Sequence, residues 1–355
     1  MRVGILTSGG DCQALNATMR GLALTLYRNV KDVEIIGFID GYKGLMYEKY
    51  KKMKPKDFYD ILNVGGSILG NSRCPFKRMR IIENGFDKVK AMKNTYKKLE
   101  LDCLVVLGGN GSIKSANMLS QEGLNVIALP KTIDNDAWGT DYTFGYSSAT
   151  AIATRYLDEI KTTAASHSRV FVIEVMGHKV GHICLSAGIA AGADVILLPE
   201  IPYDIKVVAK KVKETLKNEK NYAIIACAEG AISEADALMK RKDYKAKVLA
   251  RNGRSVAYEV ADELSQEIDA EIRVSCIGHA QRGGNPNSYD REISTRFGVE
   301  GARLIIKKHY GEYVVLQENH VTHIPLEATA GKLKYVDTEG EIVQSAKLVG
   351  ISFGE

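Results

Sequence analysis

The sequence predicts an α/β protein made of two similar three-layer α/β domains with mainly parallel sheets. Short apolar runs rich in Val, Ile and Leu alternate with longer amphipathic stretches, as in buried parallel strands joined by helices. Glycine-rich turns follow several of these runs, which is typical of strand–helix junctions that bind phosphate. The chain has 355 residues, more than one small core organises, so we expect two domains.

The composition is that of an ordinary globular protein, with 45% hydrophobic residues, 26% charged residues and a formal net charge of +5. The lysines are scattered and form no basic tract, so we expect no nucleic-acid binding. The six cysteines are far apart and include no Cys-x-x-Cys pair, which indicates free thiols in a reducing compartment. No signal peptide or membrane-spanning run is evident, and we expect a cytoplasmic protein with no membrane partner.

Three apolar runs in the first half of the chain end in loops suited to phosphate or metal chemistry. Run 2–7 ends in Ser-Gly-Gly-Asp, run 102–107 in Gly-Gly-Asn-Gly-Ser, and run 124–129 in Pro-Lys-Thr-Ile-Asp-Asn-Asp. Open parallel sheets bind their ligands at the carboxyl ends of the strands. The other elements expected in this half are a strand over 33–39 and helices over 14–27, over 86–99 and up to residue 119.

Asp134 and Asp136 are the central candidates for catalysis. Their spacing suits one carboxylate as a proton acceptor and the other as a ligand of a hard cation. The alternative is a polar turn that only caps the next helix. Two further candidates come earlier in the chain. The basic pair Arg73 and Arg78 follows a glycine-rich loop and is suited to phosphate, and Tyr42 is expected to be an exposed aromatic able to stack on a base.

The second half of the chain repeats the strand–helix alternation. The Met-Gly-His turn after run 170–175 and Glu229 after run 223–228 are strand-end candidates. Arg273, Arg282 and Arg291 are expected around one turn with His279, an arrangement that favours phosphate binding. The remaining tail from residue 329 carries no functional signal. Further strands are expected over 195–198 and 273–277, and helices over 145–163, 183–191, 204–216, 234–242, 256–268 and up to residue 308.

The motifs together resemble the phosphofructokinases that phosphorylate fructose 6-phosphate on its 1-hydroxyl. The resemblance runs over residues 3–319. It rests on LTSGGD at 6–11, GGNGS at 108–112, PKTIDND at 130–136, GTDYTFG at 139–145, MGHKVG at 176–181 and GHAQRGG at 278–284.

The resemblance implies a Mg²⁺-assisted transfer of the γ-phosphoryl group of ATP, with Asp134 as the general base. It implies that Thr132, Asp136 and His178 are also catalytic, and that Asp136 and Asn110 bind Mg²⁺. The implied ATP site contains Gly10, Tyr42, Arg73, Cys74, Arg78, Gly109, Asn110, Gly111, Ser112 and Lys131. The implied fructose 6-phosphate site contains Thr132, Ile133, Asp134, Arg169, Met176, Gly177, His178, Glu229, Arg273, His279 and Arg282.

The resemblance also implies an oligomer, because Arg169 and Arg273 match arginines that reach the 6-phosphate bound to a neighbouring subunit. We expect a homotetramer with shared active sites, each in a cleft between two domains. The expected donor domain covers 1–144 and 280–325, and the expected sugar-phosphate domain covers 145–279 and 326–355.

Three features depart from the family pattern and leave alternatives open. Asn110 replaces a usual acid, and His178 replaces the arginine of many ATP-using members. Gly111 is typical of ATP users, whereas Lys131 is typical of pyrophosphate users, so a pyrophosphate-dependent enzyme is the alternative. A non-catalytic sugar-phosphate sensor is the second alternative. For allostery, Arg20 matches an effector-site arginine of the bacterial enzymes, but Leu24 replaces its partner, and we expect a weak effector response.

Overall fold

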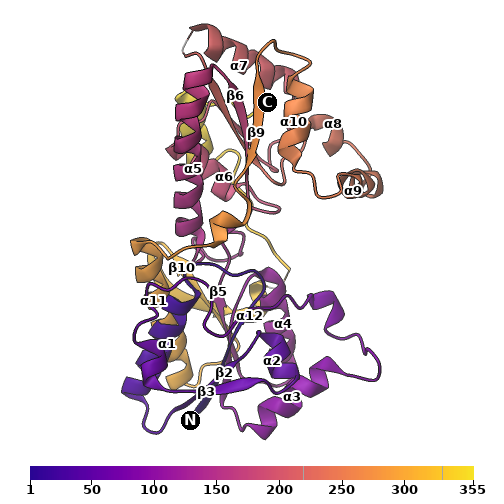
Figure 1. The fold of residues 1–355 in the computed structure, drawn as a ribbon. Helices are drawn as coiled ribbons and strands as arrows, with labels where there is room; N and C mark the ends of the chain where they lie inside the picture. The colour runs from indigo at the N-terminus through magenta and orange to yellow at the C-terminus, as the bar shows by residue number, and fades with distance from the viewer. Residues whose placement is uncertain (219, 330) are drawn as a thin grey trace. The chain divides into compact units, whose positions relative to one another are not determined.

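The structure is a computed structural model that describes residues 1–218, 220–329 and 331–355 (Figure 1). The chain divides into two compact units, each mixing helices with a mainly parallel sheet, which confirms the predicted α/β class. Unit 1 contains Met1–Ser148 and Arg282–Lys334, and unit 2 contains Ala149–Gln281 and Tyr335–Glu355. Residues 326–329 and 331–334, which we expected in the second domain, therefore lie in unit 1.

Unit 1 is built on a seven-stranded sheet in the order β11-β10-β5-β4-β1-β2-β3. The central strands β1, β4 and β5 are parallel and fully or almost fully buried, as their continuous apolar runs predict. Antiparallel strands β3 and β11 close the two edges. The bounds are β1 (Arg2–Ser8), β2 (Glu34–Phe38), β3 (Tyr50–Met53), β4 (Cys103–Gly108), β5 (Val126–Pro130), β10 (Glu312–Gln317) and β11 (His320–Pro325).

Helices cover both faces of this sheet, with α1 and α11 on one side and α2, α3 and α4 on the other (Figure 1). The first pair packs closely because glycines face the neighbouring backbone. A Cβ on Gly21 would lie 2.7 Å from the Thr295 carbonyl oxygen, and one on Gly298 would lie 2.3 Å from that of Thr18. The bounds are α1 (Leu15–Asn29), α2 (Tyr42–Met46), η1 (Pro55–Phe58), η2 (Phe76–Arg78), α3 (Lys88–Lys98), α4 (Asn110–Gln121), α11 (Ser288–Ile306) and α12 (Leu326–Thr329).

Unit 2 is built on a four-stranded, all-parallel sheet in the order β7-β8-β6-β9. Strands β6 and β8 are buried in the centre, whereas edge strand β9 leaves Arg273 and Cys276 exposed. The bounds are α5 (Tyr146–His167), β6 (Val170–Val175), α6 (His182–Ala190), β7 (Val195–Leu197), α7 (Ile205–Asn218), β8 (Ala223–Ala228), α8 (Glu234–Ala237), α9 (Arg241–Ala250), α10 (Val256–Leu264), β9 (Ile272–Cys276), η3 (Gly278–Arg282) and α13 (Glu341–Leu348).

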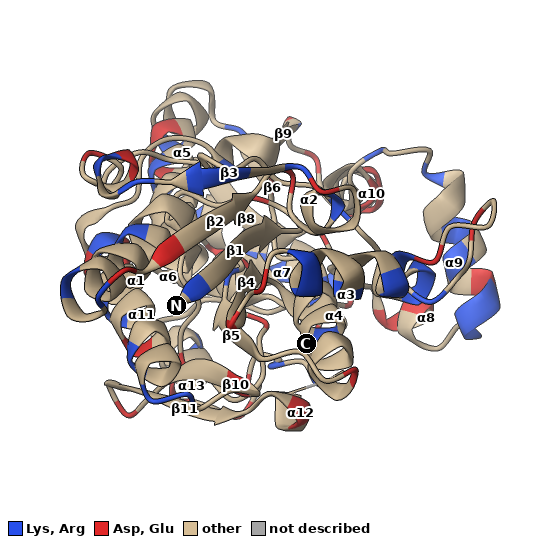
Figure 2. Ribbon diagram, turned by 90° about the horizontal axis from the view of Figure 1, so that it is seen from below, with Lys and Arg blue, Asp and Glu red and all other residues tan. Residues whose placement is uncertain are grey.

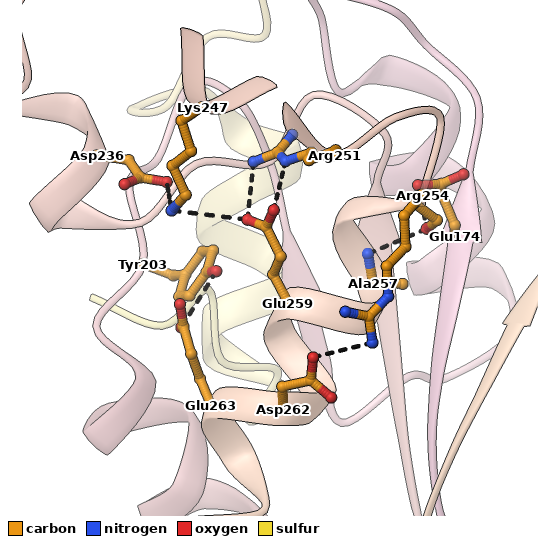
Figure 3. A network of polar contacts seen from close by, with 11 residues as sticks. Glu174, Tyr203, Asp236, Lys247, Arg251, Arg254, Ala257, Glu259, Asp262 and Glu263 are labelled. Atoms are coloured by element: carbon orange, nitrogen blue, oxygen red, sulfur yellow. Dashed lines mark hydrogen bonds and ion pairs between the residues drawn. The ribbon is translucent and has the colours of Figure 1, made fainter. Parts of the chain in front are cut away.

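The expected single helix over 234–242 is wrong, because the structure has two helices, α8 and α9, that meet α10 through polar contacts. Helix α9 carries many charged side chains and buries none of its residues (Figure 2). Glu259 on α10 accepts two bonds from Arg251, at 2.5 and 2.9 Å, and lies 3.7 Å from Lys247, which also donates to the buried Asp236 at 2.6 Å (Figure 3). A charge network thus holds a helix that has no apolar face.

Among the helices of residues 1–218, 220–329 and 331–355, none is long and apolar enough to cross a bilayer.

Candidate active site

Three loops meet at one edge of the unit 1 sheet. Strands β1, β4 and β5 are neighbours and parallel, and Ser8, Gly108 and Pro130 at their carboxyl ends are in register. The three motifs that follow these strands therefore lie side by side, as the sequence predicts. Their convergence argues against a turn that only caps the next helix.

The stretch that carries the two carboxylates is a fixed turn. The Asp134 N–H donates to the Thr132 hydroxyl at 3.1 Å, and the Thr143 hydroxyl donates to the Thr132 carbonyl at 2.7 Å. Between the carboxylates, Asn135 has a φ of 54°, a left-handed conformation that asparagine tolerates well. Its buried side-chain oxygen accepts the Thr143 N–H at 3.1 Å. Ile133 is fully buried and faces the core, so it shapes the turn from beneath.

Asn110 and Asp136 come together although they lie on different loops. Asn110 is the first residue of α4, and its side-chain amide donates to the Asp136 carboxylate at 2.7 Å. The carboxylate and the amide oxygen are the hard ligands that Mg²⁺ prefers. Within the described residues, no group of three or more His, Cys, Asp or Glu side chains could hold a metal ion. A Mg²⁺ ion here would therefore need phosphate oxygens and water to complete its coordination.

Two cationic side chains lie beside the Ser-Gly-Gly-Asp loop. The Lys131 amine donates to the Gly10 carbonyl, and the Arg282 guanidinium donates to the Asp11 carbonyl at 2.9 Å. Lys131 is buried, and burial lowers its pKa below the ordinary lysine value. A Cβ at position 10 would lie 2.8 Å from the Arg282 guanidinium, so the arginine packs directly on Gly10.

The second glycine loop forms the start of α4. Gly109 precedes the helix, the Ser112 N–H donates to the Gly109 carbonyl at 2.9 Å, and Ser112 is buried. Gly111 is exposed, and no atom lies within 4 Å of the position that its Cβ would occupy. A side chain at position 111 would therefore enter open space in front of the helix.

A cavity of about 220 Å³ in unit 1 is lined by Arg73, Cys74 and Arg78, three residues predicted for the donor site. Arg78 is held by Glu83, with 2.9 Å between the guanidinium and the carboxylate. Sequence reasoning missed Tyr47, which also lines this cavity and stacks on Phe86 with 5.1 Å between ring centroids. The full lining is Lys43, Met46, Tyr47, Arg73, Cys74, Pro75, Arg78, Met79, Glu83 and Lys88.

The expected exposure of Tyr42 is wrong. Tyr42 is fully buried at the start of α2, and its hydroxyl donates to the Ser112 carbonyl at 2.8 Å. Burial also raises the pKa of this tyrosine well above its usual value. Tyr42 therefore supports the second glycine loop from behind and does not present its ring to solvent.

In unit 2, the Met-Gly-His turn follows β6 and Glu229 follows β8, so both lie at the carboxyl edge of the sheet. The Glu229 carboxylate accepts the His178 N–H at 2.6 Å and the Gly177 N–H at 3.2 Å. His178 is exposed and has a φ of 54°. Gln281, which sequence reasoning did not single out, is buried and accepts the Met176 N–H at 3.3 Å. The carboxylate and the amide thus shape this turn.

Arg169 and Arg273 lie at the other edge of the same sheet, near the starts of β6 and β9. Both pair with Glu271, Arg169 at 2.7 Å. A six-residue strand is about 20 Å long. These arginines are therefore separated, within one chain, from the His178 turn and Glu229.

The three arginines that we expected around one turn with His279 each have a local partner. Arg273 pairs with Glu271, Arg282 binds the Asp11 carbonyl, and Arg291 donates to the Pro286 carbonyl at 2.7 Å. His279 lies exposed in η3. Each arginine has a different local partner, which residue spacing alone does not reveal.

Comparisons with known proteins agree with this set of motifs. A family model described as Phosphofructokinase matches residues 2–305. The ATP-dependent 6-phosphofructokinase of Spirochaeta thermophila is 46% identical over 99% of this chain and 97% of its own length. The ATP-dependent 6-phosphofructokinase 3 of Bacteroides thetaiotaomicron is 42% identical over the full length of both chains.

Solved structures with a similar fold are also phosphofructokinases. A phosphofructokinase from Saccharomyces cerevisiae superposes with a TM-score of 0.80 at 28% identity, covering 93% of this chain and 45% of the yeast chain. A pyrophosphate-dependent phosphofructokinase from Nitrosospira multiformis gives a TM-score of 0.82 at 20% identity, covering 96% and 87% of the two chains. The latter likeness concerns the fold alone. With its motifs, its sheet-edge loops and its full-length relatives, the chain belongs to the phosphofructokinase family.

Proposed function

We propose that this chain is an ATP-dependent 6-phosphofructokinase acting in glycolysis. It transfers the γ-phosphoryl group of ATP to the 1-hydroxyl of fructose 6-phosphate, giving fructose 1,6-bisphosphate and ADP. The observation that carries the proposal is the convergence of the Asp134–Asp136 turn with two glycine loops at one sheet edge. The two full-length relatives described above are ATP-dependent 6-phosphofructokinases, which supports ATP as the donor.

Asp134 is the general base in this proposal. It accepts the proton of the 1-hydroxyl while the hydroxyl oxygen bonds to the γ-phosphorus and the bond from phosphorus to the ADP oxygen breaks. A positioned base contributes on the order of 10² to 10⁴-fold to the rate. The Thr132 hydroxyl accepts the Asp134 N–H, which fixes the backbone of the turn that carries the base.

Asp136 and Asn110 are suited to hold Mg²⁺ together with the phosphates of the donor. Their oxygens are hard ligands, and Mg²⁺ is usually bound by one or two carboxylates, substrate phosphates and water. The bound ion would neutralise charge that develops on the transferring phosphoryl group. Because Asn110 brings no charge, this chain should need a higher Mg²⁺ concentration for half-maximal activity than an Asn110→Asp variant.

The donor contacts the glycine loops at Gly10 and at Gly109, Gly111 and Ser112, and its nucleoside part lies near Arg73, Cys74 and Arg78. The cavity of about 220 Å³ beside these arginines supports this placement. Met176, Gly177, His178 and Glu229 contact the sugar. His178 supplies a hydrogen-bond donor and, when protonated, a positive charge.

Pyrophosphate is the second candidate donor because the Lys131 amine lies at the Gly10 carbonyl, within the phosphate cradle. Gly111 favours ATP, since the space in front of it is open to a nucleotide. The Cβ of an aspartate at position 111 would have no atom of this chain within 4 Å, so the carboxylate would enter that space. Gly111→Asp should therefore raise the KM for ATP much more than the KM for fructose 6-phosphate.

The donor assay tests the proposal directly. Purified protein is incubated with fructose 6-phosphate, Mg²⁺ and either ATP or pyrophosphate, and fructose 1,6-bisphosphate is measured. Turnover with ATP supports the proposal, and turnover with pyrophosphate alone replaces ATP as the donor. If fructose 6-phosphate binds but neither donor supports turnover, the non-catalytic sensor is correct.

We also propose that the enzyme is a cytoplasmic homotetramer with shared active sites. The placement of Arg169 and Arg273 at the far edge of the unit 2 sheet supports sharing, because they lie away from the residues proposed to contact the sugar of the same chain. The exposed edge strand β9 supports an interface there. Arg273→Ala mixed with Asp134→Ser should recover activity through hybrid sites; mixtures no more active than either variant would contradict sharing.

A further inference from the structure

The segment Gly331–Lys334 lies outside the region that the family model matches, which ends at residue 305. It nevertheless contacts the loop 136–141, which begins with Asp136 of the catalytic turn. Leu333 forms an antiparallel bridge with Ala137, and the Lys334 N–H donates to the Asp136 carbonyl at 2.9 Å. The Lys332 amine lies 4.0 Å from the ring centroid of Trp138. Three consecutive residues of the segment therefore contact three consecutive residues of the loop.

The Lys334 side chain closes the far end of that loop. Its amine donates to the carbonyls of Thr140 and Asp141, each at 2.8 Å. Lys334 thus binds both ends of the loop 136–141, with its backbone at one end and its amine at the other. Part of the side chain is shielded from solvent, which strengthens such charge-assisted bonds.

The loop needs such a restraint because its middle is exposed. Trp138 is 38% exposed, and Gly139 has a φ of 87°. The Asp141 N–H is anchored by the Leu316 carbonyl at 2.8 Å, but Asp136 lies five residues earlier. Lys334 joins the anchored end of the loop to the end that carries the carboxylate.

We propose that Lys334 is a positioning residue that holds Asp136, and through it the catalytic turn, in its productive orientation. This inference rests on the proposed function, in which Asp136 assists phosphoryl transfer. Lys334 acts through the loop and touches neither substrate. Because a misplacement of 1 Å can cost about 100-fold in rate, loss of the amine should lower kcat about 10- to 100-fold.

The first experiment is a double-mutant cycle. Lys334→Met removes the amine and keeps the length of the side chain. Lys347→Met is the matched control, since Lys347 lies on α13 and pairs with Glu355. Lys334→Met should lower kcat about 10- to 100-fold with both KM values within about twofold. In an Asp136→Asn background the same change should cost less than about threefold, because the group that it orients is already lost.

The cycle separates positioning from simple loss of folded protein, which would multiply the two effects. A full 10-fold loss by Lys334→Met in the Asp136→Asn background would overturn the inference. So would a kcat of Lys334→Met within twofold of the original chain. Partial rescue by Lys334→Arg, which can still donate to two carbonyls, would support the inference.

The second experiment does not depend on activity. Amide hydrogen exchange at residues 137–141 should be at least tenfold faster in Lys334→Met than in Lys347→Met, with exchange in the central strands unchanged. Equal exchange in the two variants would overturn the inference even if the chain proves to be a kinase. If exchange is faster in Lys334→Met and the original chain turns over with neither donor, the restraint by Lys334 is established and only the proposed function is refuted.

Discussion

Asp290 offers a sharp test of how the loop behind the catalytic turn is held. Its carboxylate is fully buried near the start of α11 and accepts four hydrogen bonds. One oxygen binds the Tyr142 hydroxyl at 2.8 Å and the Gly145 N–H at 3.0 Å. The other binds the Ser148 N–H at 2.8 Å and the Ser148 hydroxyl at 2.5 Å. All four donors come from the segment that follows Asp136.

The change Asp290→Asn keeps the shape but replaces one acceptor oxygen with a donor. The amide oxygen can serve Tyr142 and Gly145, and the Ser148 hydroxyl can turn to accept. The Ser148 N–H then has no acceptor, at a cost of about 1 to 3 kcal/mol for a buried donor. Loss of charge weakens the two remaining bonds by about 1 kcal/mol each. Easier burial of a neutral amide offsets part of this, so we expect a net loss of about 3 kcal/mol.

Urea unfolding measures this loss through the transition of unit 1, followed by the fluorescence of Trp138. The matched control is Glu292→Gln, since Glu292 is exposed on the same helix, α11, and pairs with Arg296 at 3.4 Å. The control should change the unfolding free energy by less than about 0.5 kcal/mol. A loss below about 1 kcal/mol for Asp290→Asn, with the control unchanged, would refute the reasoning that the four bonds stabilise this loop.

Three further predictions concern Glu200, Tyr42 and Glu259. Burial raises the pKa of Glu200, whose carboxylate accepts the Val336 N–H at 3.0 Å. The folded state therefore binds the carboxyl proton of Glu200 more tightly than the unfolded chain does. The stability that this protonation contributes is lost as pH rises through the folded pKa. When the free energy of unfolding is measured between pH 4 and 8, the Glu200→Gln variant should become more stable relative to the original chain as pH rises. Parallel plots of the free energy of unfolding against pH for the two proteins would contradict this. Tyr42→Phe removes the hydrogen bond to the Ser112 carbonyl. The change should lower the free energy of unfolding by about 1 kcal/mol, measured by thermal unfolding, and should raise the KM for ATP. An unchanged KM for ATP would argue that Tyr42 does not support the glycine loop. Glu259→Gln weakens the charge network that holds α9. Limited proteolysis should therefore cut residues 238–254 faster in this variant than in the original chain, with little change in the midpoint of global unfolding. Equal cleavage rates in the two proteins would show that the network is dispensable.

The central part of the fold could be predicted because its strands are continuous apolar runs. Strands β4 and β8 are buried along their whole length, and such runs have few alternatives to a parallel sheet. The hairpin of β10 and β11 was missed, although its signal is present. The turn residues Glu318 and Asn319 both have positive φ, as in the tight turns that join antiparallel strands, and an apolar run precedes them.

Helix α9 could not be predicted, because the periodicity of an amphipathic helix reflects burial and this helix buries nothing. Its partners Glu259 and Asp236 lie on other elements, and only the tertiary structure brings them together.

The catalytic turn and the glycine loops could be placed from the sequence because strand order brings strand ends together. The partners of individual side chains could not. Tyr42 lies under Ser112 and not in solvent, and Arg169 and Arg273 share Glu271, because nearby donors and acceptors decide these contacts. The part played by Lys334 was also hidden, since a lysine in a polar tail has no periodicity to mark it.

The distribution of the thiols makes this chain suited to chemical labelling. Four cysteines are buried, Cys74 is partly buried, and Cys276 is exposed on edge strand β9. Burial raises the pKa of Cys12 to about 12, which suppresses the reactive thiolate in the folded protein. A maleimide dye should therefore react first at Cys276 and next at Cys74. The first label would report whether another subunit covers β9, and protection of the second by ATP would report occupancy of the donor cavity.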